Sequence, residues 1–200
     1  MTDKPSMLDE AAPTPLSSAQ DFRLLMEAMA RPGKVVELAP SKVTTKLFNQ
    51  ASRLCALALC DHEVSIWLDA GLAQPQVIEF LNFHTGSNIV QDLATADFVF
   101  FSAMPSLEEL NSLQIGTPQY PDRSATVILE MANISAGDGY VLSGPGIQDK
   151  HYIDVDGLSQ EFIQWWPENR ARFPLGIDVY LTSDSALVGL PRTTTIEENS

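Results

Sequence analysis

The stretch Asp97-Phe98-Val99-Phe100-Phe101 is short, bulky and almost continuously apolar, and it decides which fold the sequence predicts. A strand with one face in water would alternate apolar and polar side chains, whereas this run is typical of a strand that is covered on both faces. It therefore predicts a buried sheet with further layers packed above and below it.

Helical and strand patterns alternate around this run in the first half of the chain, whereas paired strands dominate the second half. Ser17 and Gln20 form a capping-box pattern that predicts the start of a first helix, which Pro32-Gly33 ends. The other expected helices run from about Lys46 to Cys60, from Pro75, from Ser106, and from Gln160 to about Trp166, where Pro167 ends the last one. The other expected strands are 35–38, 64–68, 126–131, 140–143, 177–182 and 186–190, with hairpins across 137–139 and 183–185. This order predicts an α/β fold with a mixed sheet and helices on both faces.

The length of 200 residues suits one domain with short extensions. We expect residues 1–16 to form a flexible arm, because prolines punctuate a polar stretch, residues 17–195 to form a single domain, and residues 196–200 to form a tail. A chain of this size buries roughly 70% of the surface that its unfolded state exposes, so it needs neither disulfides nor a metal to fold.

The formal net charge of −14 limits the partners that the chain can have. An acidic excess repels nucleic acids and anionic membranes, so we expect neither as a partner. Cys55 and Cys60 fall in one expected helix, with their Cα atoms about 8–9 Å apart on diverging faces, which is beyond the reach of a disulfide. Two reduced thiols, and no apolar stretch near the roughly 20 residues of a membrane span, predict a soluble cytoplasmic protein.

Motifs that would carry catalysis or hold a metal do not occur in the sequence. The three histidines, His62, His84 and His151, lack the spacing of zinc ligands relative to one another or to cysteine. There is no G-x-S-x-G nucleophile motif and no phosphate-binding P-loop, and neither cysteine has an electropositive context. We therefore predict a chain without a metal, a cofactor or a complete active site of its own.

One candidate binding loop contains Gly144 and Gly146, which follow an expected strand. Glycines allow the backbone to approach a ligand or a partner closely. Pro145 lies between them and removes one N–H from any anion site. A tight turn without a binding role is therefore the alternative interpretation of this loop.

A second candidate loop is Arg192-Thr193-Thr194, directly after the last expected strand. One guanidinium and the neighbouring hydroxyls can hold a phosphate or a phosphonate, but the same groups can cap a helix or form a salt bridge at the rim of the protein. His84 follows an expected helix, where it either bonds the last carbonyls of that helix or has a functional role.

Several motifs, taken in order, resemble those of one family. They are Phe22-Arg23 with Met29 and Pro32-Gly33, Phe83-His84-Thr85, Gly144-Pro145-Gly146-Ile147, Phe173-Pro174-Leu175-Gly176-Ile177-Asp178, and Leu190-Pro191-Arg192-Thr193-Thr194. In this order and separation they resemble the PhnH family of phosphonate-metabolism proteins, over nearly everything after the N-terminal arm. The resemblance implies a three-layer α/β/α fold with a mixed sheet, related to the large domain of pyridoxal-phosphate-dependent transferases but without the lysine site for that cofactor.

The resemblance also implies partners and a reaction. It implies a homodimer in isolation and membership, with the G, I and J subunits, of the carbon–phosphorus lyase assembly. That assembly transfers an alkylphosphonate to ribose C1 of ATP and displaces adenine. We therefore expect an accessory subunit without an assigned catalytic residue, with Arg23, Arg192, Thr193 and Thr194 as anion or interface contacts and His84 as a further one.

Two other functions stay open from the sequence. A binding module would deliver a phosphonate or ATP through Arg192 and its threonines, without catalysis. A free-standing small-molecule enzyme would instead turn over ATP and a phosphonate without other subunits.

Overall fold

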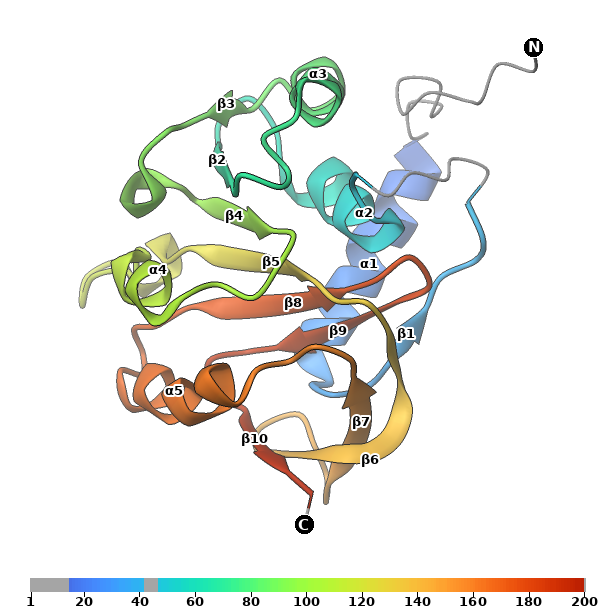
Figure 1. Cartoon of the computed structure of the whole chain (residues 1–200), viewed down its shortest axis with the longest axis vertical. Coiled ribbons are helices and arrows are strands. Elements are labelled where there is room, and N and C mark those ends of the chain that lie inside the picture. The colour runs from blue at the N-terminus through green and yellow to red at the C-terminus, as the bar shows by residue number, and fades with distance from the viewer. Residues whose placement is uncertain (1–14, 42–46, 200) are drawn as a thin grey trace.

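A seven-stranded sheet forms the centre of the computed structural model, which describes residues 15–41 and 47–199 (Figure 1). In order across the sheet, its strands are β1 (Val36–Glu37), β9 (Ala186–Leu190), β8 (Asp178–Thr182), β5 (Thr126–Glu130), β4 (Phe98–Phe101), β2 (Ser65–Leu68) and β3 (Asn88–Ile89). Neighbouring strands from β8 to β3 are parallel, whereas β9 is antiparallel to both β8 and β1. The prediction of an α/β fold with a mixed sheet is therefore confirmed.

Other layers cover both faces of this sheet, as the apolar run in β4 predicted. On one face lie α1 (Pro15–Ala30), α2 (Gln50–Leu59) and α3 (Pro75–His84), and on the other lie α4 (Leu107–Ser112), α5 (Gln160–Ala171) and a smaller sheet (Figure 1). Within β4, Val99 and Phe101 belong to the core under α4 and α5, whereas Phe100 belongs to the core under α1 and α2. The short 3-10 helices η2 (Leu93–Thr95) and η3 (Pro121–Arg123) lie in the connections.

The smaller sheet consists of β6 (Ile134–Ser143), β7 (His151–Val155) and β10 (Thr195–Glu198), in the order β10-β6-β7. The predicted hairpin across 137–139 is wrong, because β5 lies in the central sheet and β6 in the smaller one. The glycines form an irregular segment inside β6, where the register shifts between Ala136 and Tyr140. The carboxylate of Asp154 fills the space that the missing side chains leave, since Gly139 N–H donates to it at 2.7 Å.

Two helices start at residues other than those predicted, the first helix earlier and the second later. The first helix begins at Pro15, so Ser17 lies inside it rather than capping it. Proline is favoured at the first turn, because its fixed φ suits the helix and its missing N–H is not needed there. The helix expected from Lys46 begins at Gln50, with Asn49 as its cap; Lys46, like residues 1–14 of the expected arm, lies outside the described residues.

The last helix does not end at Pro167 as predicted, because α5 continues to Ala171. Trp165 and Trp166 are buried before the proline, and Asn169 is buried after it. The amide of Asn169 donates to the carbonyl oxygen of Ile177 and accepts from its N–H, both at 2.9 Å. These contacts hold the helix on both sides of Pro167 and offset the hydrogen bond that proline cannot make.

The residues expected as a tail continue the fold. Strand β10, Thr195–Glu198, pairs antiparallel with β6, and Ile196 is buried in the core. Cys55 and Cys60 are both buried as free thiols, and burial raises the pKa of each thiol. In the described ranges no helix is long and apolar enough to cross a bilayer.

Candidate functional site

Arg192 lies two residues after the end of β9 and faces Asp178, the first residue of β8. Its Nε donates to Oδ1 of Asp178 at 3.1 Å and its Nη2 to Oδ2 at 2.6 Å, and the backbone N–H of Arg192 also donates to Oδ1 at 2.7 Å. The planar guanidinium matches both oxygens of the carboxylate in a way that lysine cannot. This ion pair therefore fixes the end of β9 beside the start of β8.

The remaining N–H groups of Arg192 reach three other residues. Nη1 donates to the carbonyl oxygens of Pro121 and Pro174, at 3.3 and 3.1 Å, and Nη2 donates to the hydroxyl of Ser124 at 2.6 Å. We call Arg192, Asp178 and these three acceptors the Arg192 junction. All five guanidinium N–H groups have an acceptor in it. The structure thus shows that Arg192 forms a salt bridge, which was one of the two interpretations of this loop. Anion binding by Arg192 stays a prediction, and it requires that one of these hydrogen bonds break.

Gly144 and Gly146 bring the other candidate loop against two further motifs. Both have positive φ, 130° and 84°, a region that side chains rarely adopt. A Cβ at Gly146 would collide with the carbonyl oxygen of Ala30 at the end of α1, and one at Gly144 would lie 3.1 Å from the carbonyl oxygen of Thr193. The glycines therefore allow the close approach of this chain's own backbone, and contact with a ligand or partner stays a prediction.

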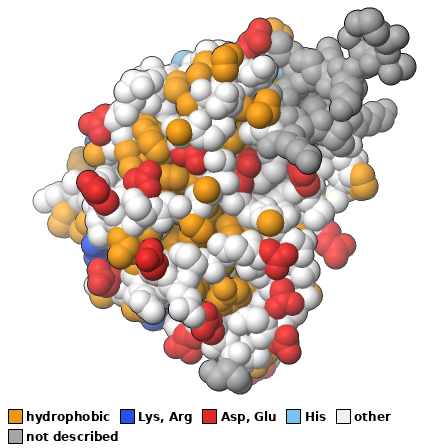
Figure 2. Space-filling view, in the orientation of Figure 1, with side chains coloured by type: hydrophobic (Ala, Val, Ile, Leu, Met, Phe, Trp, Pro, Cys, Tyr) orange, Lys and Arg blue, Asp and Glu red, His pale blue; other side chains and the backbone are white. Residues whose placement is uncertain are grey.

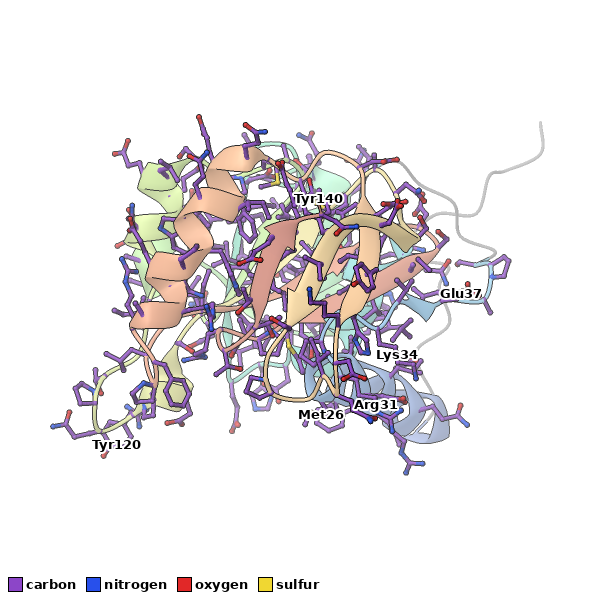
Figure 3. The ribbon with its side chains drawn as sticks, turned by 90° about the horizontal axis from the view of Figure 1, so that it is seen from below. Met26, Arg31, Lys34, Glu37, Tyr120 and Tyr140 are labelled. Carbon is purple, nitrogen blue, oxygen red and sulfur yellow. The ribbon has the colours of Figure 1, made fainter. Side chains whose placement is uncertain are left out.

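The turn after α1 is held by charged and polar contacts of its own. Glu27 pairs with Lys34 at 2.7 Å and with Arg31 at 3.6 Å; Arg31 and Lys34 lie beside α1 in Figure 3. Nδ1 of His151, at the start of β7, lies 2.6 Å from the carbonyl oxygen of Pro32. The end of α1 is thereby joined to the smaller sheet.

Thr193 and Thr194 do not join Arg192 in one polar cluster. Thr194 is fully buried, and its carbonyl oxygen accepts from the indole N–H of Trp166 at 2.7 Å. Its hydroxyl is buried without a hydrogen-bond partner among the described residues. Thr193 is half-buried beside Gly144. The expected grouping of one guanidinium with threonine hydroxyls is therefore not present in this arrangement.

A cleft of about 270 Å³ opens at the amino-terminal edge of the parallel strands. Its lining residues are Met29, Leu59, Phe98, Thr126, Asp178, Tyr180 and Pro191. Three of them, Met29, Asp178 and Pro191, come from three separate motifs of the sequence, so the fold brings distant motifs to one place. We take this cleft and the adjoining Arg192 junction as the candidate functional site.

The polar groups of the cleft are hydrogen-bond acceptors and neutral hydroxyls. The negative charge of Asp178 is compensated by Arg192, and the hydroxyl of Tyr180 donates to the carbonyl oxygen of Leu25 at 3.1 Å. Burial raises the pKa of Tyr180, so its hydroxyl stays protonated at neutral pH. None of the lining residues is basic. The cleft therefore suits a neutral group that donates hydrogen bonds better than it suits an anion.

Arg23 and His84 lie apart from this cleft. Arg23 is exposed on α1. His84 lies in the last turn of α3, with its ring centroid 4.7 Å from that of Phe80 and 4.9 Å from that of Phe83. The structure therefore groups Arg192 with the glycine loop but does not bring the other two expected residues to the same site.

The carboxyl-terminal edge of the same strands carries a group that the sequence reasoning missed. Glu130, the last residue of β5, accepts from the backbone N–H of Asn49 at 2.8 Å. Burial raises the pKa of Glu130 to about 7, because it outweighs the hydrogen bonds from Asn49 and Ser52, and Asp184 and Asp69 add repulsion. Its position directly after the buried run Val127–Leu129 is the only signal that the sequence offered.

Glu130 belongs to a set of groups that satisfy the start of α2. The N–H groups of Asn49, Gln50, Ala51 and Ser52 donate to Glu130, to Asp184 Oδ1, to the carbonyl oxygen of Ser183 and to Asn49 Oδ1. This edge is where open α/β folds commonly bind ligands, and a helix start commonly binds anions. Here the chain's own carboxylates occupy that position. Neither here nor elsewhere in the described ranges are three His, Cys, Asp or Glu side chains placed to hold a metal.

Comparison with known protein families assigns the chain to one family. A family model described as "Bacterial phosphonate metabolism protein (PhnH)" matches residues 11–197. The chain belongs to the PhnH family. The matched range contains the cleft, the Arg192 junction and Glu130, so the whole candidate site lies within the family's extent.

Two curated proteins are similar to the chain along most of their length. One, from Rhizobium meliloti (strain 1021), is named alpha-D-ribose 1-methylphosphonate 5-triphosphate synthase subunit PhnH; it is 35% identical over 198 residues, which cover 98% of this chain and 99% of the relative. The other, HtxG of Stutzerimonas stutzeri, is named as a candidate C-P lyase subunit protein; it is 31% identical over 181 residues, which cover 88% and 83%. The resemblance to the PhnH family stated from the motifs is thereby confirmed.

Proposed function

We propose that the chain is an accessory subunit of the carbon–phosphorus lyase system, supporting the transfer of an alkylphosphonate to ribose C1 of ATP with loss of adenine. The observation that carries the proposal is the similarity, over nearly the whole of both chains, to a protein named as a subunit of ribose 1-methylphosphonate 5-triphosphate synthase. A chain that is similar to such a relative over nearly the full length of both is expected to take the same place in an assembly.

The internal pairing of the charged groups supports a role in which the chain presents a folded surface to other subunits. The Arg192 junction uses its guanidinium and carboxylate for each other, and the start of α2 uses Glu130 and Asp184 for its own N–H groups. Charged groups that satisfy one another fix the positions of the segments they join. They leave few donors or acceptors for a substrate, which favours chemistry on a neighbouring subunit.

Copurification tests this proposal. When the tagged chain is produced together with the G, I and J subunits of the same organism, we expect these subunits to accompany it through affinity and size-exclusion chromatography. Produced alone, we expect the chain to elute as a homodimer. Failure to associate with any of the three subunits, or turnover of ATP and methylphosphonate by the isolated chain, contradicts the accessory role.

A second candidate function is binding of the nucleotide or the phosphonate without catalysis, and the cleft beside Thr126 and Asp178 favours it. Its acceptors suit the amino group of an adenine base better than they suit a phosphonate. Calorimetry is therefore expected to detect binding of ATP but not of methylphosphonate. The heat of ATP binding is expected to disappear in the Thr126→Val variant. No heat from either ligand removes this candidate.

From the resemblance we further propose two properties of the chain. The first is a relation of the fold to the large domain of pyridoxal-phosphate-dependent transferases without the cofactor site. It is supported by Lys34 and Lys150, the lysines of the described ranges, which are exposed and lie outside the central sheet. The second is a cytoplasmic location, supported by the free thiols of Cys55 and Cys60.

A further inference from the structure

A groove runs between α4 and α5, where these two helices pack against each other on the face of the sheet opposite to α1 (Figure 1). It has a volume of about 260 Å³. Its lining residues are Leu107 and Asn111 of α4, and Glu161, Gln164, Trp165 and Glu168 of α5. We call it the α4–α5 groove. It shares no residue with the cleft or with the Arg192 junction.

The groove has an apolar floor that is fixed in place. Leu107 leaves 43% of its surface exposed there, although it is a large apolar residue. Trp165 also lines the groove with one edge, since only 4% of its surface is exposed, and its indole N–H donates to Oδ1 of Asn111 at 3.1 Å, so the ring is held in one orientation. An exposed leucine beside a fixed indole is a surface on which an apolar side chain of a partner can pack.

The rim of the groove is acidic. Glu161 and Glu168 are seven residues apart, which places them on one side of α5 about 10.5 Å apart along its axis. Both are exposed, and neither forms an ion pair within the part of the chain that the structure describes; Glu108 is exposed nearby on α4. The cation at this groove is Arg172, whose Nη2 donates to Asn111 at 3.3 Å. Figure 2 shows acidic side chains bordering apolar ones over the lower left of the molecule, with basic side chains at the margin of this region.

We propose that the α4–α5 groove is the docking site of a cationic amphipathic helix from another subunit of the assembly, an inference that rests on the proposed function. A helix lying along α5 places apolar side chains on Leu107 and Trp165. Lysine or arginine residues one heptad apart on that helix then face Glu161 and Glu168. A second copy of this chain fits less well, because no helix in the part of the chain that the structure describes carries two lysine or arginine residues.

Charge reversal with a matched control tests the groove. The probe is a short fluorescent helical peptide of leucine and lysine, compared with a serine and lysine peptide of equal charge. Glu161→Lys with Glu168→Lys is expected to weaken binding of the leucine-containing peptide about tenfold, the combined effect of two rim ion pairs. Glu63→Lys with Glu79→Lys makes the same change in net charge at exposed positions elsewhere and is expected to change binding less than about twofold. Equal effects of the two double variants overturn the proposal.

A photo-crosslinking residue in place of Leu107 identifies the occupant in the assembled complex. Crosslinking to one of the co-produced subunits, at a basic helix, supports the proposal; crosslinking to a second copy of this chain overturns it. If both double variants copurify with the other subunits as the unchanged protein does, the groove inference fails and the proposed function stands. If the unchanged chain copurifies with none of them, the proposed function fails, and the assignment of the partner fails with it.

Discussion

Arg192 binds four other residues of the chain, so its replacement should lower the stability of the fold and not only affect binding. Arg192→Ala leaves the carboxylate of Asp178 half-buried without its cation, together with three acceptors that lose a donor. We expect a loss of about 3 kcal/mol in the free energy of unfolding, measured with urea. Arg192→Lys keeps the charge but not the two-pronged geometry, so we expect a loss of about 2 kcal/mol.

A second arginine provides the control for this experiment. Within the described ranges the side chain of Arg172 donates to Asn111, at 3.3 Å, and Arg172→Ala is expected to cost less than about 1 kcal/mol. Equal losses at Arg172 and Arg192 would show that the junction has no special part in the stability of the fold.

Glu130 is expected to make the folded chain less stable as pH rises, because burial raises the pKa of its carboxyl group. Its pKa rises from an ordinary 4.5 to about 7 in the folded chain. Between these pH values the folded state keeps a proton that the unfolded state has released, so stability falls as pH rises through this window and is constant above it. The loss amounts to at most about 3 kcal/mol. Urea unfolding at several pH values measures it.

Glu130→Gln isolates this contribution, because an amide does not titrate. The variant is expected to lose the decline between pH 4.5 and 7 and to be more stable than the unchanged chain at pH 8. Glu161→Gln, on the exposed side of α5, is the matched control and should keep the decline. A Glu130→Gln protein whose stability still falls through the same window would rule out this origin.

At the scale of elements, sequence patterns predicted those segments whose local chemistry agrees with their environment. The run Asp97–Phe101 predicted β4, Pro75 predicted the start of α3, and Ser106 predicted the start of α4, which its side chain caps. Each of these signals acts within a few residues. They therefore do not depend on how the rest of the chain folds.

Elements set by contacts between distant segments could not be predicted in this way. Gly137–Gly139 has the composition of a hairpin turn, but Asp154 of β7 converts it into an irregular strand. Strand β10 contains two glutamates, so its sequence is typical of a polar tail, and only its pairing with β6 makes it a strand. Pro167 ends a helix by local rules, yet burial on both sides continues α5 through it.

The same limit applies to the candidate site. The motifs indicated Arg192 and the glycine loop as important places, and the structure brings them near one cleft. The sequence could not show that Asp178, fourteen residues earlier, would bind the guanidinium. Nor could it show that Glu130 would lie half-buried at the start of α2, because Asn49 is 81 residues away.

Gly146 is expected to be the least replaceable glycine of its loop. With φ at 84° and the carbonyl oxygen of Ala30 in the way, Gly146→Ala forces the loop off the end of α1. We expect a loss of about 3 kcal/mol, seen as a lower Tm. Gly157→Ala is the control, because its φ of 92° is similarly positive but its nearest neighbour is a flexible methionine at 3.8 Å. It should cost about 1–2 kcal/mol.

At the scale of the molecule, the two sheets share one core and are expected to unfold together. Leu142 of β6 is fully buried in the same cluster as Val188 and Leu190 of β9. Leu142→Ala is therefore expected to lower the stability of the whole chain by about 3 kcal/mol while leaving one transition. Tryptophan fluorescence and far-UV circular dichroism should report the same midpoint.

The control for this experiment is Tyr152→Ala on the neighbouring strand β7, since Tyr152 is 45% exposed and outside the buried cluster. It should cost less than about 1 kcal/mol. Two separate transitions in Leu142→Ala would mean that the smaller sheet unfolds on its own.

The strand order has a consequence for how the polypeptide is made. Val36 pairs with Leu187, so the first strand waits for a partner about 150 residues further along. At a synthesis rate of roughly 5–20 residues per second, that wait on the ribosome lasts about 8–30 s. During that time β5 also has its β8 edge open, because β8 is translated just before β9. A nascent chain with unfilled sheet edges depends on rapid completion of translation or on chaperones, so co-production of chaperones should raise the yield of soluble protein.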